Sequence, residues 1–198
     1  MEKDKDVYNK TSFTEVLFFR IVFMVKYFVL SVFIVLPFNA NAKVVVFFSP
    51  HGNCEQMIVK QINTAQKTVD AAVYSINNDN IVNALLDAKQ RGVKIRILTD
   101  RIQAAGKSSK VKYLYDNNVN IRVHSNFKIE HNKFAIYDGV YGSTGSFNWT
   151  NPAEKKNSEN CVFFDNVDGV LDSYINRFEY LWEKNTKKKS DAWIEKHF

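Results

Sequence analysis

The chain has 198 residues, which suits a single domain, and 45% of them are hydrophobic, which is enough to form a buried core. Its formal net charge is +6, so a strongly acidic protein is excluded. A modestly basic domain suits an anionic partner such as nucleic acid or an anionic lipid surface. Many globular proteins carry a similar charge without such a partner, so composition alone does not establish one.

The first 42 residues are expected to form a signal peptide or an N-terminal membrane anchor. Residues Phe18–Phe38 are largely apolar, but basic residues interrupt them and leave Tyr27–Phe38 as the longest uncharged stretch. This stretch is too short to span a bilayer comfortably and suits the apolar region of a secretory signal. Ala40-Asn41-Ala42 follows as a small-x-small cleavage site, and we expect cleavage after Ala42. The alternatives are an uncleaved anchor over Leu17–Phe38 and a buried core helix. A signal or an anchor would favour a domain that is secreted or periplasmic, or membrane-anchored and facing outside the cytoplasm.

Residues 43–186 are predicted to form an α/β domain with a layered mixed β-sheet flanked by helices. Apolar runs and alternation predict strands at Val44–Phe48, Thr68–Ser75, Val93–Leu98, Ile121–His124, Phe134–Tyr137, Val140–Ser143 and Cys161–Phe164. Apolar residues at helical spacing predict helices at Glu55–Ala65, Asp79–Arg91, Lys110–Asn117 and Asp168–Lys184. Asp79 is a candidate N-cap of its helix. Residues 102–109 are expected to be a mobile loop that shapes substrate access.

The C-terminal residues 187–198 begin with three lysines and are expected to be a solvated basic tail. The two cysteines, Cys54 and Cys161, have no Cys-x-x-Cys or Cys/His spacing, which argues against a structural zinc site. Export of the domain would permit a disulfide between them. The sequence does not tell whether the two residues lie close enough, so two buried thiols are the default expectation.

One stretch, HNKFAIYDGVYGSTGSFNWT from His131 to Thr150, concentrates residues suited to phosphodiester chemistry. On an extended segment residues i and i+2 point to the same face, so His131 and Lys133 are predicted to project into one pocket. Neutral imidazole is a competent nucleophile near pH 7, and a covalent intermediate divides a difficult displacement into two easier ones. The spacing H-x-K-x4-D-x6-G-S-x-N is formed by His131, Lys133, Asp138, Gly145, Ser146 and Asn148.

This spacing resembles the active-site motif of the phospholipase D superfamily. The resemblance covers residues from about Val44 to Asn185, where the chain is similar to the short, single-motif bacterial endonucleases of the Nuc type. Supporting stretches are VVFFSPHGNC, VDAAVYSINNDNIVNALLDAKQRGVKIRILTDR and KKNSENCVFF. The resemblance implies a phospholipase D-like fold and hydrolysis of a phosphodiester. The chain is also similar to the mitochondrial single-motif members, but it lacks their Cys/His-rich insertion.

The resemblance implies roles for the main residues of the motif. His131 would be the nucleophile that forms a phosphohistidine. Glu159 would accept a hydrogen bond from His131 and fix its tautomer. Lys133 and Asn148 would donate hydrogen bonds to the nonbridging phosphate oxygens, and preorganised donors of this kind stabilise charge in the transition state.

Other residues of the stretch have two interpretations each. Asp138 belongs to the motif but sits in a strong turn sequence, so a structural role in holding the loop is favoured over contact with substrate. Phe147 and Trp149 flank Asn148 and suit either a stacking wall for bases or packing in the core. Ser146 is expected to supply a further hydrogen bond in the phosphate pocket, and Gly145 to bind substrate by allowing close approach of the backbone. Arg101, Lys155 and Lys156 are candidates for contacts with flanking phosphates, although each also suits a solvated surface.

A second group must protonate the leaving oxygen, but the chain has no second H-x-K, because His51, His124 and His197 have no lysine two residues on. A symmetric homodimer would solve this by bringing His131 of each subunit together. No cofactor or metal ion is implied, since the sequence has no acidic cluster of the kind that two-metal nucleases use.

The function predicted first is a metal-independent, non-specific endonuclease that acts on DNA, with RNA as a further candidate substrate. The alternative is a phospholipase D that hydrolyses membrane phospholipid headgroups, because the same site can attack either phosphodiester. An inactive nucleic-acid-binding module is a third hypothesis, which the intact motif disfavours.

Overall fold

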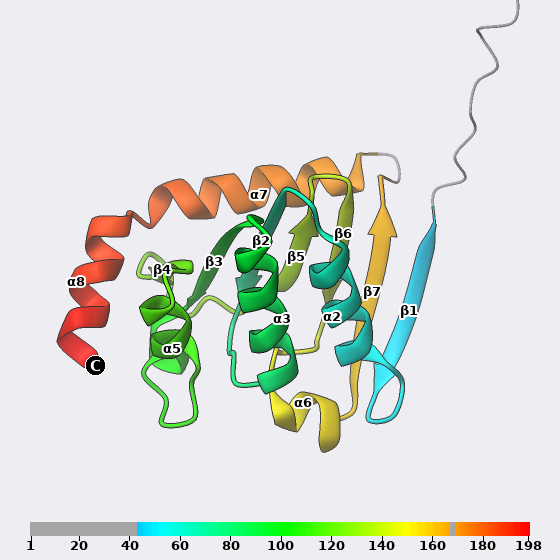
Figure 1. Cartoon of the computed structure of the whole chain (residues 1–198), viewed down its shortest axis with the longest axis horizontal. Helices are drawn as coiled ribbons and strands as arrows, with labels where there is room; N and C mark the ends of the chain where they lie inside the picture. The colour runs from blue at the N-terminus through cyan, green and yellow to red at the C-terminus, as the bar shows by residue number, and fades with distance from the viewer. Residues whose placement is uncertain (1–42, 167–168) are drawn as a thin grey trace, which may run out of the picture. The chain divides into compact units, whose positions relative to one another are not determined.

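The computed structural model describes residues 43–166 and 169–198, so the prediction of a signal or anchor at residues 1–42 lies outside the described part of the chain. The described residues belong to one compact unit, Ala42–Phe198. Its strands are β1 (Val44–Ser49), β2 (Thr68–Val73), β3 (Lys94–Asp100), β4 (Asn120–His124), β5 (Lys133–Tyr137), β6 (Tyr141–Gly145) and β7 (Glu159–Asp165). They form a seven-stranded sheet in the order β1-β7-β6-β5-β2-β3-β4 (Figure 1).

The sheet is mixed, as the sequence predicts. Strands β2, β3 and β4 run parallel, and the other neighbouring pairs are antiparallel. Val73 at the end of β2 lies opposite Lys133 at the start of β5, and Gly145 at the end of β6 lies opposite Cys161 in β7. The ends of β2, β3 and β6 and the starts of β5 and β7 therefore share one edge of the sheet. We call it the His131 edge, because His131 stands two residues before β5.

Helices cover both faces of the sheet (Figure 1). They are α2 (Cys54–Thr64), α3 (Asp79–Gln90), α4 (Arg101–Ala104), α5 (Val111–Asp116), α6 (Asn151–Lys155), α7 (Val170–Lys184) and α8 (Lys187–His197). Successive side chains of a strand point to opposite faces. Along β5, Ala135 and Tyr137 therefore join a core with α2 and α3, while Phe134 and Ile136 join a second core with α7. Among residues 43–166 and 169–198, none of the helices has the length and apolarity needed to cross a membrane.

Helix α3 begins at the predicted residue, but its cap is a different one. The Asn78 side chain, and not Asp79, accepts a hydrogen bond from the N–H of Ile81 at 3.0 Å. The Asn78 amide is in turn held by Glu55, whose Oε2 accepts from it at 2.5 Å. Asp79 instead forms an ion pair with Lys110 at 2.8 Å. Asparagine and aspartate are equally good N-caps, so the tertiary partner Glu55 decides which of them takes the role.

A disulfide joins Cys54 at the start of α2 to Cys161 in β7, with their Cα atoms 5.9 Å apart. The default expectation of two buried thiols is therefore wrong. The two residues are 107 positions apart in sequence and meet only because α2 packs on the sheet beside β7. A crosslink that closes so long a loop stabilises the fold by about 4 to 5 kcal/mol in the chain-entropy model.

The C-terminal segment is also not a solvated tail, because it forms helix α8. Thr186 caps the helix by accepting a hydrogen bond from the N–H of Lys189 at 3.4 Å. Ser190 and Ile194 are buried, and the Ser190 hydroxyl accepts from the N–H of Val123 in β4 at 3.0 Å. The helix thus covers the last strand of the sheet, while its lysines stay exposed.

Asp138 fastens the edge of the sheet opposite the His131 edge. It follows β5 with φ at 54°, and its carboxylate accepts hydrogen bonds from the backbone N–H groups of Gln66, Lys67 and Thr68 at 2.8, 2.7 and 2.9 Å. Burial raises the pKa of Asp138, but these hydrogen bonds and the charge of Lys67 outweigh it and leave the pKa below its usual value. The structure therefore gives Asp138 the loop-holding role and separates it from His131 by the length of β5.

We predict that Asp138→Asn lowers the free energy of unfolding by about 1 to 2 kcal/mol at pH 7, the scale for hydrogen bonds to a partly exposed charged group. Asparagine tolerates the left-handed backbone, so the turn itself is preserved. The lowered pKa means that the contribution is present above the unfolded pKa and disappears as pH falls through the folded pKa. Urea unfolding at several pH values measures the difference. Equal unfolding midpoints for the two proteins at pH 7 would contradict the role.

Candidate active site

His131 and Lys133 lie beside the same aromatic ring at the His131 edge. Tyr74 directly follows β2, and its ring packs in a T-shaped arrangement against the His131 imidazole, with ring centroids 4.6 Å apart. The Nζ atom of Lys133 lies 5.0 Å from the centroid of the same ring. It also donates a hydrogen bond to the backbone oxygen of His131 at 2.6 Å. The structure thus brings together the two residues that the motif predicts to share a pocket.

A pair of polar side chains lies where β6 ends and β7 begins. The Ser146 hydroxyl donates to Glu159 Oε2 at 2.5 Å, and the Asn157 amide donates to Glu159 Oε1 at 2.9 Å. The Ser146 oxygen in turn accepts from the N–H of Asn160 at 3.0 Å. Within the described part of the chain, the Glu159 carboxylate has no hydrogen bond from His131. In this structure it orients Ser146 instead of the imidazole.

The Lys133 ammonium interacts with the side chains on both sides of the site. It lies beside the Tyr74 ring that contacts His131, and the Glu159 carboxylate attracts its charge. Burial lowers the pKa of Lys133, while the carboxylates of Glu159 and Glu130 act in the opposite direction without restoring the usual value. A lysine in this state loses its proton at lower pH than an exposed lysine does. The site therefore holds an ammonium group that is partly desolvated and is stabilised by Glu159.

Asn148 and its two aromatic neighbours have separate roles. The Asn148 side chain is half-buried, and its Oδ1 atom has no hydrogen-bond partner among the described residues. An unpaired buried amide oxygen requires an explanation, and a hydrogen bond accepted from a ligand donor is one. Phe147 and Trp149 are each only 3% exposed and belong to the core with α2 and α3. The packing interpretation of these two residues is therefore correct, and they offer no stacking wall.

Gly145 allows a close approach between two strands. Its φ is +150°, and a Cβ atom at this position would lie 2.3 Å from the backbone oxygen of Asn160. Any other residue would push β6 away from β7 and separate Ser146 from Glu159. The close approach at this glycine is made to β7, and its predicted role in binding substrate stays a prediction.

The three predicted cationic contacts are exposed. Arg101 begins α4 directly after β3, which places it at the His131 edge. Lys155 ends α6 and Lys156 follows it, close in sequence to Asn148. Their proposed contact with flanking phosphates stays a prediction.

Sequence reasoning missed two residues that shape the site, Tyr74 and Glu130. Glu130 is only 1% exposed, and its Oε1 accepts from the backbone N–H and the side-chain amide of Asn132 at 3.1 and 2.5 Å. Its own N–H donates to Asp100 Oδ2 at 3.0 Å, which ties the turn before β5 to the end of β3. A glutamate in a polar loop resembles a solvated residue, and only its position next to His131 offers a signal. Tyr74 resembles an ordinary strand residue.

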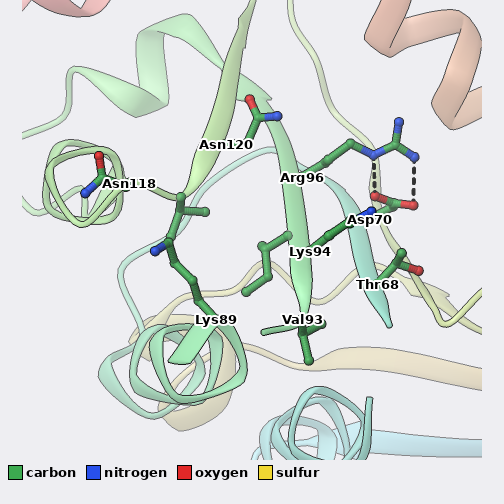
Figure 2. Close-up of a pocket in the computed structure, with 10 residues that line it drawn as sticks. Thr68, Asp70, Lys89, Val93, Lys94, Arg96, Asn118 and Asn120 are labelled. Atoms are coloured by element: carbon green, nitrogen blue, oxygen red, sulfur yellow. Dashed lines mark hydrogen bonds and ion pairs between the residues drawn. The ribbon is translucent and has the colours of Figure 1, made fainter. Parts of the chain in front are cut away.

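A groove of about 490 Å³ lies at the opposite edge of the sheet, where β2, β3 and β4 begin (Figure 2). Arg96 in this groove is paired with both carboxylate oxygens of Asp70 at 2.6 and 2.8 Å and with Glu179 at 2.6 Å. Its charge is therefore compensated, and none of the motif residues lines the groove. Within residues 43–166 and 169–198, no group of three or more His, Cys, Asp or Glu side chains could hold a metal ion.

Comparison with known proteins identifies the family. A family model described as "Cardiolipin synthase, PLD-like domain" matches residues 58–182. A protein named Phospholipase D from Rickettsia bellii is 35% identical over 136 residues, which cover 69% of this chain and 67% of that protein. A protein named Mitochondrial cardiolipin hydrolase from Xenopus laevis is 32% identical over 127 residues, which cover 64% of this chain and 60% of that protein.

A solved structure extends the likeness to the whole fold. The phospholipase D family member Nuc from Salmonella typhimurium is 33% identical, with a TM-score of 0.70 over 74% of this chain and 97% of that chain. The predicted layered mixed sheet and the resemblance inferred from the motif are both confirmed. The chain belongs to the phospholipase D superfamily, and it is a phosphodiester hydrolase of the Nuc type.

Proposed function

We propose that this protein cleaves nucleic acid as a metal-independent, non-specific endonuclease, through a phosphohistidine formed on His131. The main support is that His131 and Lys133 both contact the Tyr74 ring. This ring lies at the same edge of the sheet as the Ser146–Glu159 pair. The net charge of +6 and the likeness to Nuc over nearly all of that chain support an anionic polymer as substrate. DNA is the main substrate, and RNA is a further candidate.

In the first step, an imidazole nitrogen of His131 attacks phosphorus, and the bond from phosphorus to the leaving oxygen breaks. Lys133 is positioned to donate to a nonbridging oxygen, and the Asn148 amide is a further donor, while the one proton of the Ser146 hydroxyl is donated to Glu159. Such donors stabilise negative charge better in a partly desolvated site than in water. Lys133 is half-buried, and this burial lowers the pKa of its ammonium group.

The reaction also requires a proton donor in the first step and a base in the second step. In a homodimer, His131 of the partner subunit gives its proton to the leaving oxygen and becomes neutral. It then takes a proton from water as the water oxygen attacks phosphorus, and the bond from phosphorus to the His131 nitrogen breaks. Both histidines return to their starting protonation states, so the cycle is balanced without a metal ion.

The carboxylate of Glu159 sets the pH range in which Lys133 is charged. Because this carboxylate raises the pKa of Lys133 against the effect of burial, Glu159→Gln should lower the pKa of Lys133 further. We expect this lower pKa to appear in the side-chain NMR signal of Lys133 as pH is raised, together with a fall in kcat of up to about 100-fold. Glu195→Gln on the exposed face of α8 is the matched control. A Lys133 signal that changes over the same pH range in the wild type and in Glu159→Gln would contradict the role of Glu159.

The homodimer predicts how activity depends on inactive subunits. If each active site needs His131 from both subunits, a mixed dimer with one His131→Asn subunit is inactive. In an equal mixture after subunit exchange, about a quarter of the wild-type activity per total protein should then remain, against about half for independent subunits. Activity measured against the fraction of wild-type protein separates a quadratic from a linear dependence. Full activity in a protein shown to be monomeric would also overturn the dimer.

The alternative substrate is a membrane phospholipid, whose headgroup would be released at the same site. Relatives named Phospholipase D, such as the one from Rickettsia bellii, favour this alternative. The location that we propose is secreted or periplasmic, or membrane-anchored outside the cytoplasm. It rests on the sequence of residues 1–42 alone.

Hydrolysis of four substrates in parallel tests the proposal. Plasmid DNA, single-stranded DNA, RNA and phosphatidylcholine vesicles are each incubated with the purified protein in EDTA. We expect cleavage of nucleic acid without headgroup release, and a loss of at least about a thousandfold in His131→Asn. Headgroup release alone would replace the endonuclease by the phospholipase, and complete inhibition by EDTA would contradict metal independence.

A further inference from the structure

Tyr74 is fixed by the backbone next to the segment that carries His131. Its N–H donates to the backbone oxygen of Asn132 at 2.9 Å, and its own carbonyl oxygen accepts from the Thr99 hydroxyl at 3.4 Å. These bonds continue the links of β2 with β5 and with β3 beyond the end of β2. The place of the Tyr74 ring relative to residues 131–133 is therefore set by the sheet.

The side chain of Tyr74 contacts both functional groups of the H-x-K motif and is held at its far end. Its ring packs against the His131 imidazole, and the Lys133 ammonium lies over it. Aromatic rings attract both groups, the imidazole through a T-shaped contact and the ammonium through its charge. The phenol oxygen accepts a hydrogen bond from the side-chain amide of Gln103 at 3.0 Å. Gln103 belongs to α4, whose first turn is capped by Asp100.

His131 depends on such a support because its side chain is exposed. In the described part of the chain, its imidazole has no hydrogen-bond partner, and the carboxylate of Glu159 is engaged by Ser146 and Asn157. An unrestrained histidine samples several rotamers, and only some of them would aim a ring nitrogen at phosphorus. The contact with Tyr74 restricts this choice.

We propose that Tyr74 is the positioning residue of the active site. Its ring holds the His131 imidazole and the Lys133 ammonium in register for attack, and Gln103 holds the ring through the phenol oxygen. This inference rests on the proposed function of His131 as the nucleophile. Within one subunit, Glu159 acts on Ser146 and on Lys133, and the Tyr74 ring is the side chain that packs against the imidazole.

A residue that acts through the nucleophile affects kcat more than KM, because it changes the fraction of enzyme–substrate complexes in which the imidazole has the attacking rotamer. Tyr74→Leu removes the ring and keeps an apolar side chain. Tyr74→Phe keeps the ring and removes only the hydrogen bond from Gln103. Tyr180→Leu is the matched control, because Tyr180 is a half-exposed tyrosine on α7 with the Nζ atom of Lys184 5.7 Å from its ring centroid.

We expect kcat to fall about 10- to 100-fold in Tyr74→Leu and less than about threefold in Tyr74→Phe, with KM within about twofold in both. The control should match the wild type. Rescue by phenylalanine separates positioning by the ring from a general loss of structure. A raised KM with unchanged kcat in Tyr74→Leu would make Tyr74 a substrate-binding wall and overturn the proposal.

Histidine side-chain NMR of the full-length protein tests the contact without any activity. The His131 signals, assigned by their absence in His131→Asn, should show a ring-current displacement and a contact with the Tyr74 ring protons in the wild type and in Tyr74→Phe. In Tyr74→Leu the displacement should disappear. Unchanged His131 signals in Tyr74→Leu would overturn the proposal. If Tyr74→Leu does not fold, a missing Tyr74–His131 contact in the wild type would overturn it. Because this measurement needs no substrate, failure of the phosphodiesterase function stays distinguishable from failure of the positioning role.

Discussion

The pairing of β2 with β5 is the constraint on which the active site depends. β2 is parallel to β3 and antiparallel to β5, so the sheet changes from parallel to antiparallel at this strand. The register places Val73 opposite Lys133, and it lets the next residue, Tyr74, reach the turn that carries His131. A slip of one residue would turn Lys133 toward α7 and Phe134 toward α2 and α3. The two cores therefore fix the register, and the register fixes which side chains meet at the His131 edge.

Other supports hold the rest of this edge and act on different parts of the site. The buried Glu130 and the end of β3 at Asp100 shape the turn before His131. The disulfide ties β7, which begins with Glu159, to α2. Gly145 lets β6 approach β7 closely enough for Ser146 to reach Glu159. Separate contacts thus hold the part of the motif around His131 and the part around Ser146. The attraction between the Glu159 carboxylate and the Lys133 ammonium links the two parts.

The strands, the long helices and the motif were predictable because each leaves a local pattern. Alternating apolar residues indicate β3, an apolar run indicates β5, and the fixed spacing from His131 to Asn148 identifies the family. What the sequence did not show depends on contacts between distant residues. The Cys54–Cys161 bond, the cap at Asn78 and the docking of α8 on β4 follow from tertiary packing.

The same limit applied to residue roles in the site. The motif placed Asp138 with the catalytic residues, but strand geometry puts it at the other edge of the sheet, where three backbone N–H groups bind it. Phe147 and Trp149 stand beside Asn148 in sequence, yet they point into the core. Tyr74 lies more than fifty residues before His131 in the printed sequence, and only the pairing of β2 with β5 brings them together. The spacing of the motif residues along the chain indicated the chemistry, while the strand pairing determined which residues lie next to His131.

The most direct test of the account is detection of the covalent intermediate. Wild-type protein is mixed with a phosphodiester substrate, quenched within the first turnover under alkaline conditions that preserve phosphorus–nitrogen bonds, and digested for mass spectrometry. We expect a phosphoramidate on His131, formed together with release of the first product and absent in His131→Asn. Release of product with His131 unmodified, or with the modification on another residue, would contradict it.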